Sequence, residues 1–467
     1  MRDAPLQFPV PYVEDAAQRF AALRPLGDAI WLDSNRSRQA QGAYDIISAA
    51  PTAVLTASSD QGCMRTANGR DETLACGFLE ALREELAPWS QPATGPASGG
   101  ALGYFGYDIA RPWFGLPSPV QGDTGIPQAR VGVYEWLLVH DHQRREAQVR
   151  IHPKCRDSLR VWLREWARQL EAPQTSGEPP AFRLITPWTA RTSPTEYHSQ
   201  FDRIQQYIRA GDCYQVNLAQ RFDARYRGDP FEAYLRLRAQ SPAPYSAFIE
   251  LPEGAILSLS PEQFLQVEDR TISTRPIKGT RPRNGDPLED HRLAKAPLHS
   301  TKDRAENLMI VDLLRNDIGR CAVPGSVQVP SLFELQSFAN VHHLVSTVVG
   351  TLAAKHTPLD LLRACLPGGS ITGAPKQRAM EIINELEPYA RSLYCGTIGM
   401  VDFTGGMRTN IAIRTLVCNQ GQAHLWGGGG IVADSDVALE YEESFAKIRN
   451  LMDALGSPQC ASTHAPP

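Results

Sequence analysis

The segment RPIKGTRPR, residues 275–283, places one lysine, Lys278, between an isoleucine and a glycine and among three arginines. Pro276 fixes its own backbone torsion and lacks an N–H donor, whereas Gly279 permits torsions that other residues avoid. The arginines disfavour the ammonium form of Lys278, because like charges repel. A rigidly held amine that is uncharged is a nucleophile. A solvated basic turn is the alternative interpretation. The rest of the chain helps to decide between a nucleophilic lysine and such a turn.

The composition limits the class of protein. A chain of 467 residues is too long for one small core, so we expect two lobes. Its 47 Lys and Arg against 51 Asp and Glu give a net charge of −4, which does not favour nucleic acid or an anionic membrane as a partner. Nine dispersed cysteines without a C-x-x-C pair indicate reduced thiols and a cytoplasmic location. The N-terminus lacks an apolar signal segment, and no stretch reaches membrane-spanning length.

The chain divides into segments of different character. We expect an N-terminal lobe over residues 1–172, a linker over 173–192, a catalytic lobe over 193–456 and a disordered tail over 457–467. Ser193 opens the catalytic lobe with the pattern of a helix capping box. Because this lobe lacks regular β-α alternation, the sequence predicts an α+β fold and not a doubly wound parallel sheet.

Apolar patterns predict the elements that carry the candidate sites. Strands are expected over residues 29–32, 44–48, 131–140, 250–259, 408–416 and 422–426. Helices are expected over residues 156–170, 302–316, 376–386 and 437–455.

Two of these helices carry acidic residues in unusual places. Glu440, Glu443 and Lys447 share one face of the last helix, beside its apolar stripe. A surface ion pair between Glu443 and Lys447 is the simplest interpretation. Glu306 precedes an apolar run on the helix over 302–316, and a carboxylate on a largely buried helix requires a partner. If the two helices meet, their oxygen ligands suit Mg²⁺, which leaves coordination sites for water and an anionic substrate.

Two glycine segments are candidates for anion binding. Residues 427–430, GGGG, follow a predicted strand, and residues 367–376, PGGSITGAPK, precede a predicted helix. Glycines let backbone N–H groups approach an anion, and a helix N-terminus adds positive potential. Plain turns are the alternative, since neither segment is a P-loop. Arg414 lies between them as a natural bidentate partner of a carboxylate. We expect Asp434 or Ser435 to cap the helix after the four glycines.

Five motifs in order resemble the chorismate-utilising enzymes: residues 275–283, 306–320, 341–346, 367–376 and 427–436. The resemblance covers most of the second lobe and much of the first. It implies two lobes in which β-sheets pack as a sandwich with helices outside.

Two positions separate the branches of this family. Members that make anthranilate or isochorismate typically carry alanine where Lys278 stands. Members that hydrate or isomerise chorismate typically carry a base lysine where Gln215 stands. Both residues therefore indicate the branch that aminates chorismate at C4.

The resemblance implies a role for each matched residue. Lys278 would attack C2 of the ring and form a covalent intermediate, and Glu262 would protonate the departing C4 hydroxyl before ammonia enters. Glu306 and Glu443 would hold Mg²⁺, with Glu440 supporting through water. The residues that would bind the substrate are Gln215, Gly279, Thr280, His343, Ser370, Thr372, Tyr394, Arg414, Gly428, Gly429, Gly430 and Lys447. For His343, a place in the core is the alternative.

The resemblance also implies a partner and a product. The chain has no Gly-x-Cys-x-Gly elbow, so ammonia is expected from a separate glutamine amidotransferase subunit. No pyridoxal-phosphate lyase domain fits in the remaining length, so the product is expected to be 4-amino-4-deoxychorismate, on the route to 4-aminobenzoate and folate. Asp33 and Ser34 belong to a segment that resembles the wall of a tryptophan pocket in relatives, with a plain core strand as the alternative.

Two alternative functions stay open. The first is the anthranilate-forming branch, which Lys278 argues against. The second is a non-catalytic subunit that binds chorismate or tryptophan, which the intact Glu262, Glu306 and Glu443 argue against.

Overall fold

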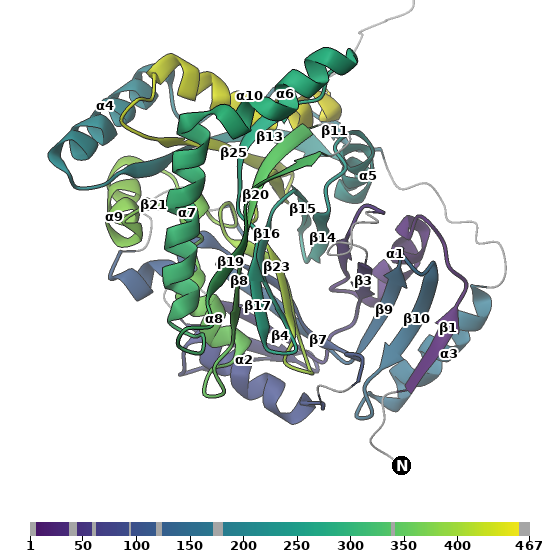
Figure 1. The fold of residues 1–467 in the computed structure, drawn as a ribbon. Coiled ribbons are helices and arrows are strands. Elements are labelled where there is room, and N and C mark those ends of the chain that lie inside the picture. Colours follow the sequence, from purple (N-terminus) through teal and green to yellow (C-terminus); the bar gives the residue numbers. More distant parts are fainter. Residues whose placement is uncertain are drawn as a thin grey trace, which may run out of the picture.

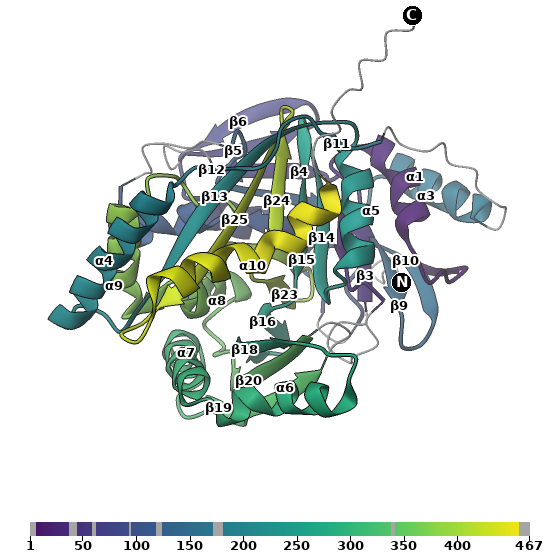
Figure 2. The ribbon, with the colours of Figure 1, turned by 90° about the horizontal axis from the view of Figure 1, so that it is seen from above.

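The computed structural model describes residues 6–36, 44–57, 62–92, 95–117, 124–170, 181–337 and 341–456. Within them, two antiparallel sheets pack as a sandwich with helices outside, as Figure 1 and Figure 2 show. This arrangement confirms the predicted α+β fold. The expected tail, residues 457–467, and the first part of the expected linker, residues 173–180, lie outside the described residues. No helix in the described ranges is long and apolar enough to cross a membrane.

The first sheet combines strands from both ends of the chain. Its order is β1 (Leu6–Val10), β10 (Glu146–Ile151), β9 (Trp136–Asp141), β3 (Tyr44–Ser48), β2 (Ile30–Asp33), β14 (Tyr245–Leu251), β15 (Gly254–Ser260), β24 (Thr415–Asn419), β25 (Gln422–Ile431), β13 (Gln215–Arg227) and β11 (Arg183–Leu184). The short strands β12 (Thr189–Ala190) and β21 (Gly373–Ala374) also pair with β13.

The second sheet also combines strands from distant parts of the chain. Its order is β18 (Ile277–Pro282), β20 (Val341–Thr351), β17 (Thr271–Thr274), β16 (Gln263–Glu268), β23 (Met407–Asn410), β22 (Thr397–Asp402), β7 (Gly100–Phe105), β8 (Ala129–Tyr134), β4 (Ala53–Ala57), β5 (Cys63–Ala67) and β6 (Arg70–Leu74), with β19 (Gln328–Ser337) paired to β20. Because β2 pairs with β14 and β7 pairs with β22, the two expected lobes share both sheets. The domain boundary stays a prediction, although the described part of the expected linker contributes β11 and β12 to the first sheet.

Helices cover the sandwich, and its buried apolar side chains form two clusters. One core lies under α1 (Ala17–Leu23), α3 (Asp157–Gln169), α5 (Pro230–Gln240) and α10 (Val437–Leu455). The other includes residues of both sheets and of α2 (Phe78–Leu86), α4 (Pro194–Ala210), α7 (Thr301–Gly319), α8 (Pro358–Cys365) and α9 (Lys376–Leu386). Helix α6 (Pro287–His299) packs with α7 against β18 and β20. Short 3-10 helices are η1 (Arg24–Leu26), η2 (Ala87–Trp89), η3 (Tyr107–Phe114) and η4 (Gly369–Ile371).

Three predicted strands are each two strands in the structure. Residues 250–259 form the end of β14 and most of β15, because Pro252 and Glu253 lie in a tight hairpin turn. Residues 131–140 divide at Glu135, and residues 408–416 divide at 411–414, because in both places the chain passes from one sheet to the other. A single continuous strand cannot serve two packed sheets.

The helix starts were predicted with mixed success. Ser193 and Glu196 form the predicted capping box at the start of α4. At α10 the cap is Asp436, whose carboxylate accepts from the N–H groups of Ala438 and Leu439, so the expected cap at Asp434 or Ser435 was wrong by one or two residues. Ser435 has a different partner, described below.

Candidate active site

A cavity of about 700 Å³ lies beside the two connections that carry the chain between the sheets. Pro261 and Glu262 connect β15 to β16, and Ile413 and Arg414 belong to the connection from β23 to β24. Residues of β18, α7, α10 and β25 complete the lining. The volume lies within the range of about 300–1,000 Å³ that is usual for sites of small molecules.

Lys278 and Glu262 both face this cavity. Glu262 is 6% exposed, and its Oε1 accepts a hydrogen bond from Ser370 Oγ at 3.2 Å. Burial raises the pKa of Glu262 to about 7, although Lys278 and the Ser370 hydrogen bond oppose the shift. The carboxyl group is therefore partly protonated at neutral pH and can act as a general acid.

The backbone around Lys278 is irregular, as the sequence suggested. Lys278 lies opposite Leu344 of β20, and the pairing shifts register between Lys278 and Arg281. Gly279, inside this irregularity, has a φ of +64°, and a Cβ there would lie 3.0 Å from Pro297 Cβ. Glycine is required at this position on both grounds.

Two of the three arginines of this segment have acidic partners. Arg281 forms an ion pair with an aspartate of α7, and Arg283 forms one with an aspartate of α6. Lys278 interacts electrostatically with three carboxylates that face the cavity, Glu262, Glu306 and Glu443. The expected effect of the arginines on Lys278 stays a prediction.

Helices α7 and α10 meet at the cavity, which was the condition for a shared acidic site. Lys302 Nζ on α7 lies 3.6 Å from Glu440 Oε1 and 4.0 Å from Glu306 Oε1. Burial raises the pKa of Glu306, with Lys278 and Lys302 opposing the shift. On α10, the predicted ion pair between Glu443 and Lys447 is confirmed at 2.7 Å.

The acidic residues fit a hard cation such as Mg²⁺ in their chemistry. A Cβ at Gly429 would lie 3.1 Å from Glu440 Oε2 and 3.6 Å from Glu443 Oε1, so both carboxylates approach the same glycine. Among the described residues, no three Asp, Glu, His or Cys side chains are grouped closely enough to ligate one ion in these rotamers. The ammonium group of Lys302 lies near both Glu306 and Glu440 and supplies positive charge there.

The four glycines lie inside β25, which corrects the expectation of a loop. Residues 427–430 pair with β13 along one edge, whereas β24 ends opposite Leu425. Within the described chain, the other edge of this segment therefore has no strand partner, and Lys447 Nζ donates to Gly428 O there at 2.9 Å. Gly427 lies directly under α10, where a Cβ would be 2.2 Å from Ser444 O. Because these glycines have no side chains, α10 can pack closely against β25 and space is left for the cavity.

Three further predicted residues give the cavity its polarity. Burial lowers the pKa of Arg414, and no carboxylate in the described part of the chain offsets this effect. His343 Nδ1 and Thr280 Oγ1 are hydrogen-bonded at 2.9 Å. Burial lowers the pKa of His343 to about 4, so its imidazole is neutral at neutral pH. An unpaired guanidinium beside a neutral imidazole favours an anionic ligand.

Most predicted site residues line this one cavity: Glu262, Lys278, Gly279, Thr280, Glu306, His343, Ser370, Tyr394, Arg414, Gly428, Gly430, Glu440, Glu443 and Lys447. Three others do not line it. Gln215 is fully buried, with its amide against Gly430, and Thr372 Oγ1 donates to Gly368 O at 2.9 Å. Gly429 faces the acidic residues of α10.

Sequence reasoning missed Asn217, Trp426 and Lys302. Asn217 is 6% exposed and lines the cavity, and its Nδ2 has no hydrogen-bond partner among the described residues. Its signal in the sequence was its position two residues after Gln215, on the same face of a strand. Trp426 stacks on Tyr394 with ring centroids 6.1 Å apart. Lys302 stands four residues before Glu306, which is the spacing of a helical ion pair.

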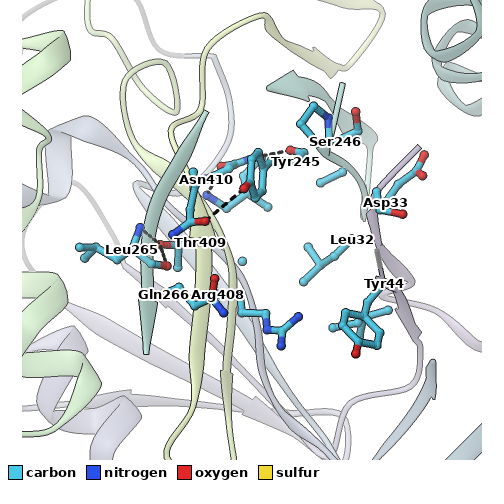
Figure 3. A pocket seen from close by; sticks show the side chains of 17 residues that line it. Leu32, Asp33, Tyr44, Tyr245, Ser246, Leu265, Gln266, Arg408, Thr409 and Asn410 are labelled. Carbon is cyan, nitrogen blue, oxygen red and sulfur yellow. Dashed lines mark hydrogen bonds between the residues drawn. The ribbon is translucent and has the colours of Figure 1, made fainter. Parts of the chain in front are cut away.

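Asp33 and Ser34 line a different, smaller pocket of about 80 Å³ between the two sheets. Figure 3 shows Leu32 and Tyr44 on one side of it and Gln266 and Thr409 on the other, with Arg408 extending toward Tyr44. The Asp33 carboxylate accepts hydrogen bonds from Tyr234 and Arg238, both on α5. The pocket is present, and its ligand stays a prediction.

A buried acid and an amine face one cavity, beside a glycine strand and an arginine that has no acidic partner in the described part of the chain, and this arrangement suits an enzyme site for a small carboxylate. Residues 27–453 match the family of chorismate binding enzymes, and the chain belongs to this family. It is 46% identical over 462 residues to aminodeoxychorismate synthase component 1 of Klebsiella aerogenes, covering 97% of this chain and 100% of the relative. It is 39% identical over 400 residues to anthranilate synthase component 1 of Streptomyces coelicolor, covering 82% and 78%. The solved structure of anthranilate synthase component I from Streptococcus pneumoniae superposes with a TM-score of 0.75 at 31% identity, covering 89% and 93%.

Proposed function

We propose that this enzyme aminates chorismate at C4 with ammonia and releases 4-amino-4-deoxychorismate, for the synthesis of 4-aminobenzoate and folate. The observation that carries the proposal is that Lys278 and Glu262 face one cavity and interact electrostatically. Lys278 is the residue that separates this branch from the anthranilate-forming branch. The full-length similarity to relatives named aminodeoxychorismate synthase component 1 supports the same choice.

In the first displacement one proton is transferred in two steps, from Lys278 to Glu262 and then from Glu262 to the leaving hydroxyl group. A proton moves from the ammonium group of Lys278 to the carboxylate of Glu262, which leaves a neutral amine and a protonated acid. The raised pKa of Glu262 makes this transfer less costly. The Lys278 nitrogen then forms a bond to C2 as the ring double bonds shift and the C4–O bond breaks. Glu262 gives its proton to the departing hydroxyl, which leaves as water.

The second displacement restores the lysine. Ammonia forms a bond to C4, the double bonds shift back, and the C2–N bond to Lys278 breaks. The proton that the C4 nitrogen loses converts the departing amine back to its ammonium form. The sum is chorismate plus ammonia giving 4-amino-4-deoxychorismate plus water, so no oxidant or reductant is needed. Two displacements replace one difficult one.

The remaining residues bind and orient the substrate. Arg414 and Lys447 supply positive charge for its carboxylates, and the edge of residues 427–430 supplies backbone N–H groups. Glu306, Glu440 and Glu443 are the residues that would hold Mg²⁺. When bound, the ion would neutralise charge on a ring carboxylate. Neutral His343 and the stacked Trp426 and Tyr394 would pack beside the ring.

We further propose a separate glutamine amidotransferase subunit as the source of ammonia. The chain has no glutaminase elbow, and its described cysteines are buried apart from the partly exposed Cys76. The chain alone is expected to turn over with ammonium and to be inactive with glutamine.

Intact-protein mass spectrometry after mixing with chorismate tests the central step. A covalent adduct mapped to Lys278 by peptide analysis is expected, and Lys278→Ala should lose both the adduct and C4 amination, by at least about a thousandfold. Lys295→Ala, on α6 and outside the cavity lining, is the matched control. C4 amination that survives in Lys278→Ala would exclude the covalent route.

The anthranilate-forming activity is the second candidate, since two of the similar proteins carry that name. Chorismate, ammonium and Mg²⁺ should give no strong anthranilate fluorescence with the wild-type enzyme. Fluorescence without an added lyase would reverse the choice. Chorismate binding without any turnover would favour a non-catalytic subunit.

A further inference from the structure

Lys302 is a cation at the acidic end of the cavity to which the proposed mechanism gives no role. It lies in the first turn of α7, and its Nζ is 3.6 Å from Glu440 Oε1 and 4.0 Å from Glu306 Oε1. Both distances exceed the range of about 2.7–3.2 Å for a direct hydrogen bond. The ammonium group therefore bridges α7 and α10 without a close bond to either carboxylate.

The carboxylates around Lys302 are like charges that lie close together. Glu440 is 4% exposed, and Ser435 Oγ, which donates to its Oε1 at 2.7 Å, holds it toward Lys302. Glu440 acts on Glu306 as a like charge, and burial disfavours ionisation of Glu306 further. Lys302 also stabilises the ionised form of Glu443. Without a nearby cation, Glu306 and Glu440, whose side chains are 16% and 5% exposed, would repel one another in a poorly solvated place.

A magnesium ion held by these carboxylates would lie about 2.0–2.1 Å from its oxygen ligands. An ammonium group within 4 Å of the same oxygens would then repel a divalent cation strongly. The Lys302 side chain is 49% exposed, so it has room to turn into solvent. Long lysine side chains make such movements at little cost.

We infer that Lys302 is an internal counter-ion that occupies the acidic site in the metal-free enzyme and is displaced when Mg²⁺ binds. Lys302 is thus a positioning residue: it holds Glu306 and Glu440 together between turnovers and competes with the ion. Competition makes Mg²⁺ binding weaker and more reversible than the three carboxylates alone would make it. The inference rests on the metal assignment in the proposed function.

The test is the dissociation constant of Mg²⁺, measured by calorimetry at pH 8 on the full chain without substrate. Lys302→Met keeps the apolar stem and removes the charge, and it should lower the dissociation constant by about three- to tenfold. The rise in melting temperature on adding Mg²⁺ should also be larger than in the wild type. Lys355→Met, at an exposed position outside the cavity lining, should change neither value.

Further variants separate the possible failures. Lys302→Gln should behave like Lys302→Met, which guards against an effect of the methionine side chain. If Glu306→Gln weakens Mg²⁺ binding while Lys302→Met leaves it unchanged or weaker, the counter-ion inference falls alone. If Glu306→Gln and Lys302→Met both bind Mg²⁺ as the wild type does, the metal assignment falls and the inference falls with it.

Discussion

Ser370 Oγ donates a hydrogen bond to Glu262 Oε1 at 3.2 Å, from η4 to the link between β15 and β16. This bond stabilises the ionised carboxylate, whereas burial stabilises the protonated form and has the larger effect. The pKa of about 7 is therefore the balance between burial and several opposing contributions, of which the charge of Lys278 is the largest and the Ser370 hydrogen bond the next. A carboxyl group with this pKa can accept a proton from Lys278 and pass it to the leaving group near neutral pH.

The pH dependence of kcat/KM should show this titration. Because Glu262 must be ionised to accept the proton from Lys278, activity should rise as pH rises through about 7. Ser370→Ala removes a hydrogen bond that lowers the pKa of Glu262, so this acidic limb should move to higher pH. Glu262→Gln should reduce kcat by roughly 10²–10⁴-fold. Ser158→Ala, on the exposed face of α3, is the control that should keep the wild-type profile. A limb that moves to lower pH in Ser370→Ala would contradict the assignment.

Much of the fold could be predicted from the sequence where local pattern decides structure. The apolar period of α10 gave its bounds, Val437–Leu455, and the serine-proline-glutamate pattern gave the start of α4. The glycines of β25 were expected as a loop, because glycine has no local preference for strand and only pairing with β13 makes them one. Local sequence likewise cannot show where a strand crosses between sheets, as at residues 411–414.

The sequence predicted which residues belong to the candidate site but not how their charges interact. The motifs named most residues of the cavity, because their chemistry and order identify the family. They could not show that Arg281 is neutralised by Asp303, since that pair depends on how α7 packs against β18. Lys302 was missed for a related reason: its second partner, Glu440, is more than a hundred residues away in the chain.

The metal dependence of activity should respond to Glu443. Glu443→Gln removes a charged oxygen ligand from the proposed Mg²⁺ site, so the Mg²⁺ concentration for half-maximal activity should rise by about tenfold or more. Glu442→Gln is a matched control on the same helix, because Glu442 is 69% exposed and outside the cavity lining. Equal Mg²⁺ dependence in both variants would contradict the ligand assignment. Mg²⁺ titrations of the steady-state rate provide the measurement.

Substrate affinity should depend on Arg414. Arg414 is half-buried, and its guanidinium has no acidic partner among the described residues, so a substrate carboxylate would pair with it. Arg414→Met should raise KM for chorismate by roughly 10–100-fold, which corresponds to the loss of a charged hydrogen bond. Arg414→Lys should recover part of the affinity, because it keeps the charge and loses the bidentate geometry. Arg449→Met, at an exposed position of α10, should leave KM unchanged. If Arg414→Met binds chorismate as tightly as the wild type, Arg414 does not bind a substrate carboxylate.

The seating of α10 on β25 should depend on the absence of a side chain at Gly427. A Cβ there would lie 2.2 Å from the backbone oxygen of Ser444, which cannot yield without moving the helix. Gly427→Ala should therefore lower the free energy of unfolding by about 1–3 kcal/mol, the usual cost of overpacking. Because α10 carries Glu440, Glu443 and Lys447, the same variant should also lose activity and require more Mg²⁺. Gly285→Ala, where a Cβ meets no atom within 4 Å, is the matched control in denaturant titrations. Equal stability of the two variants would show that α10 does not rest on this glycine.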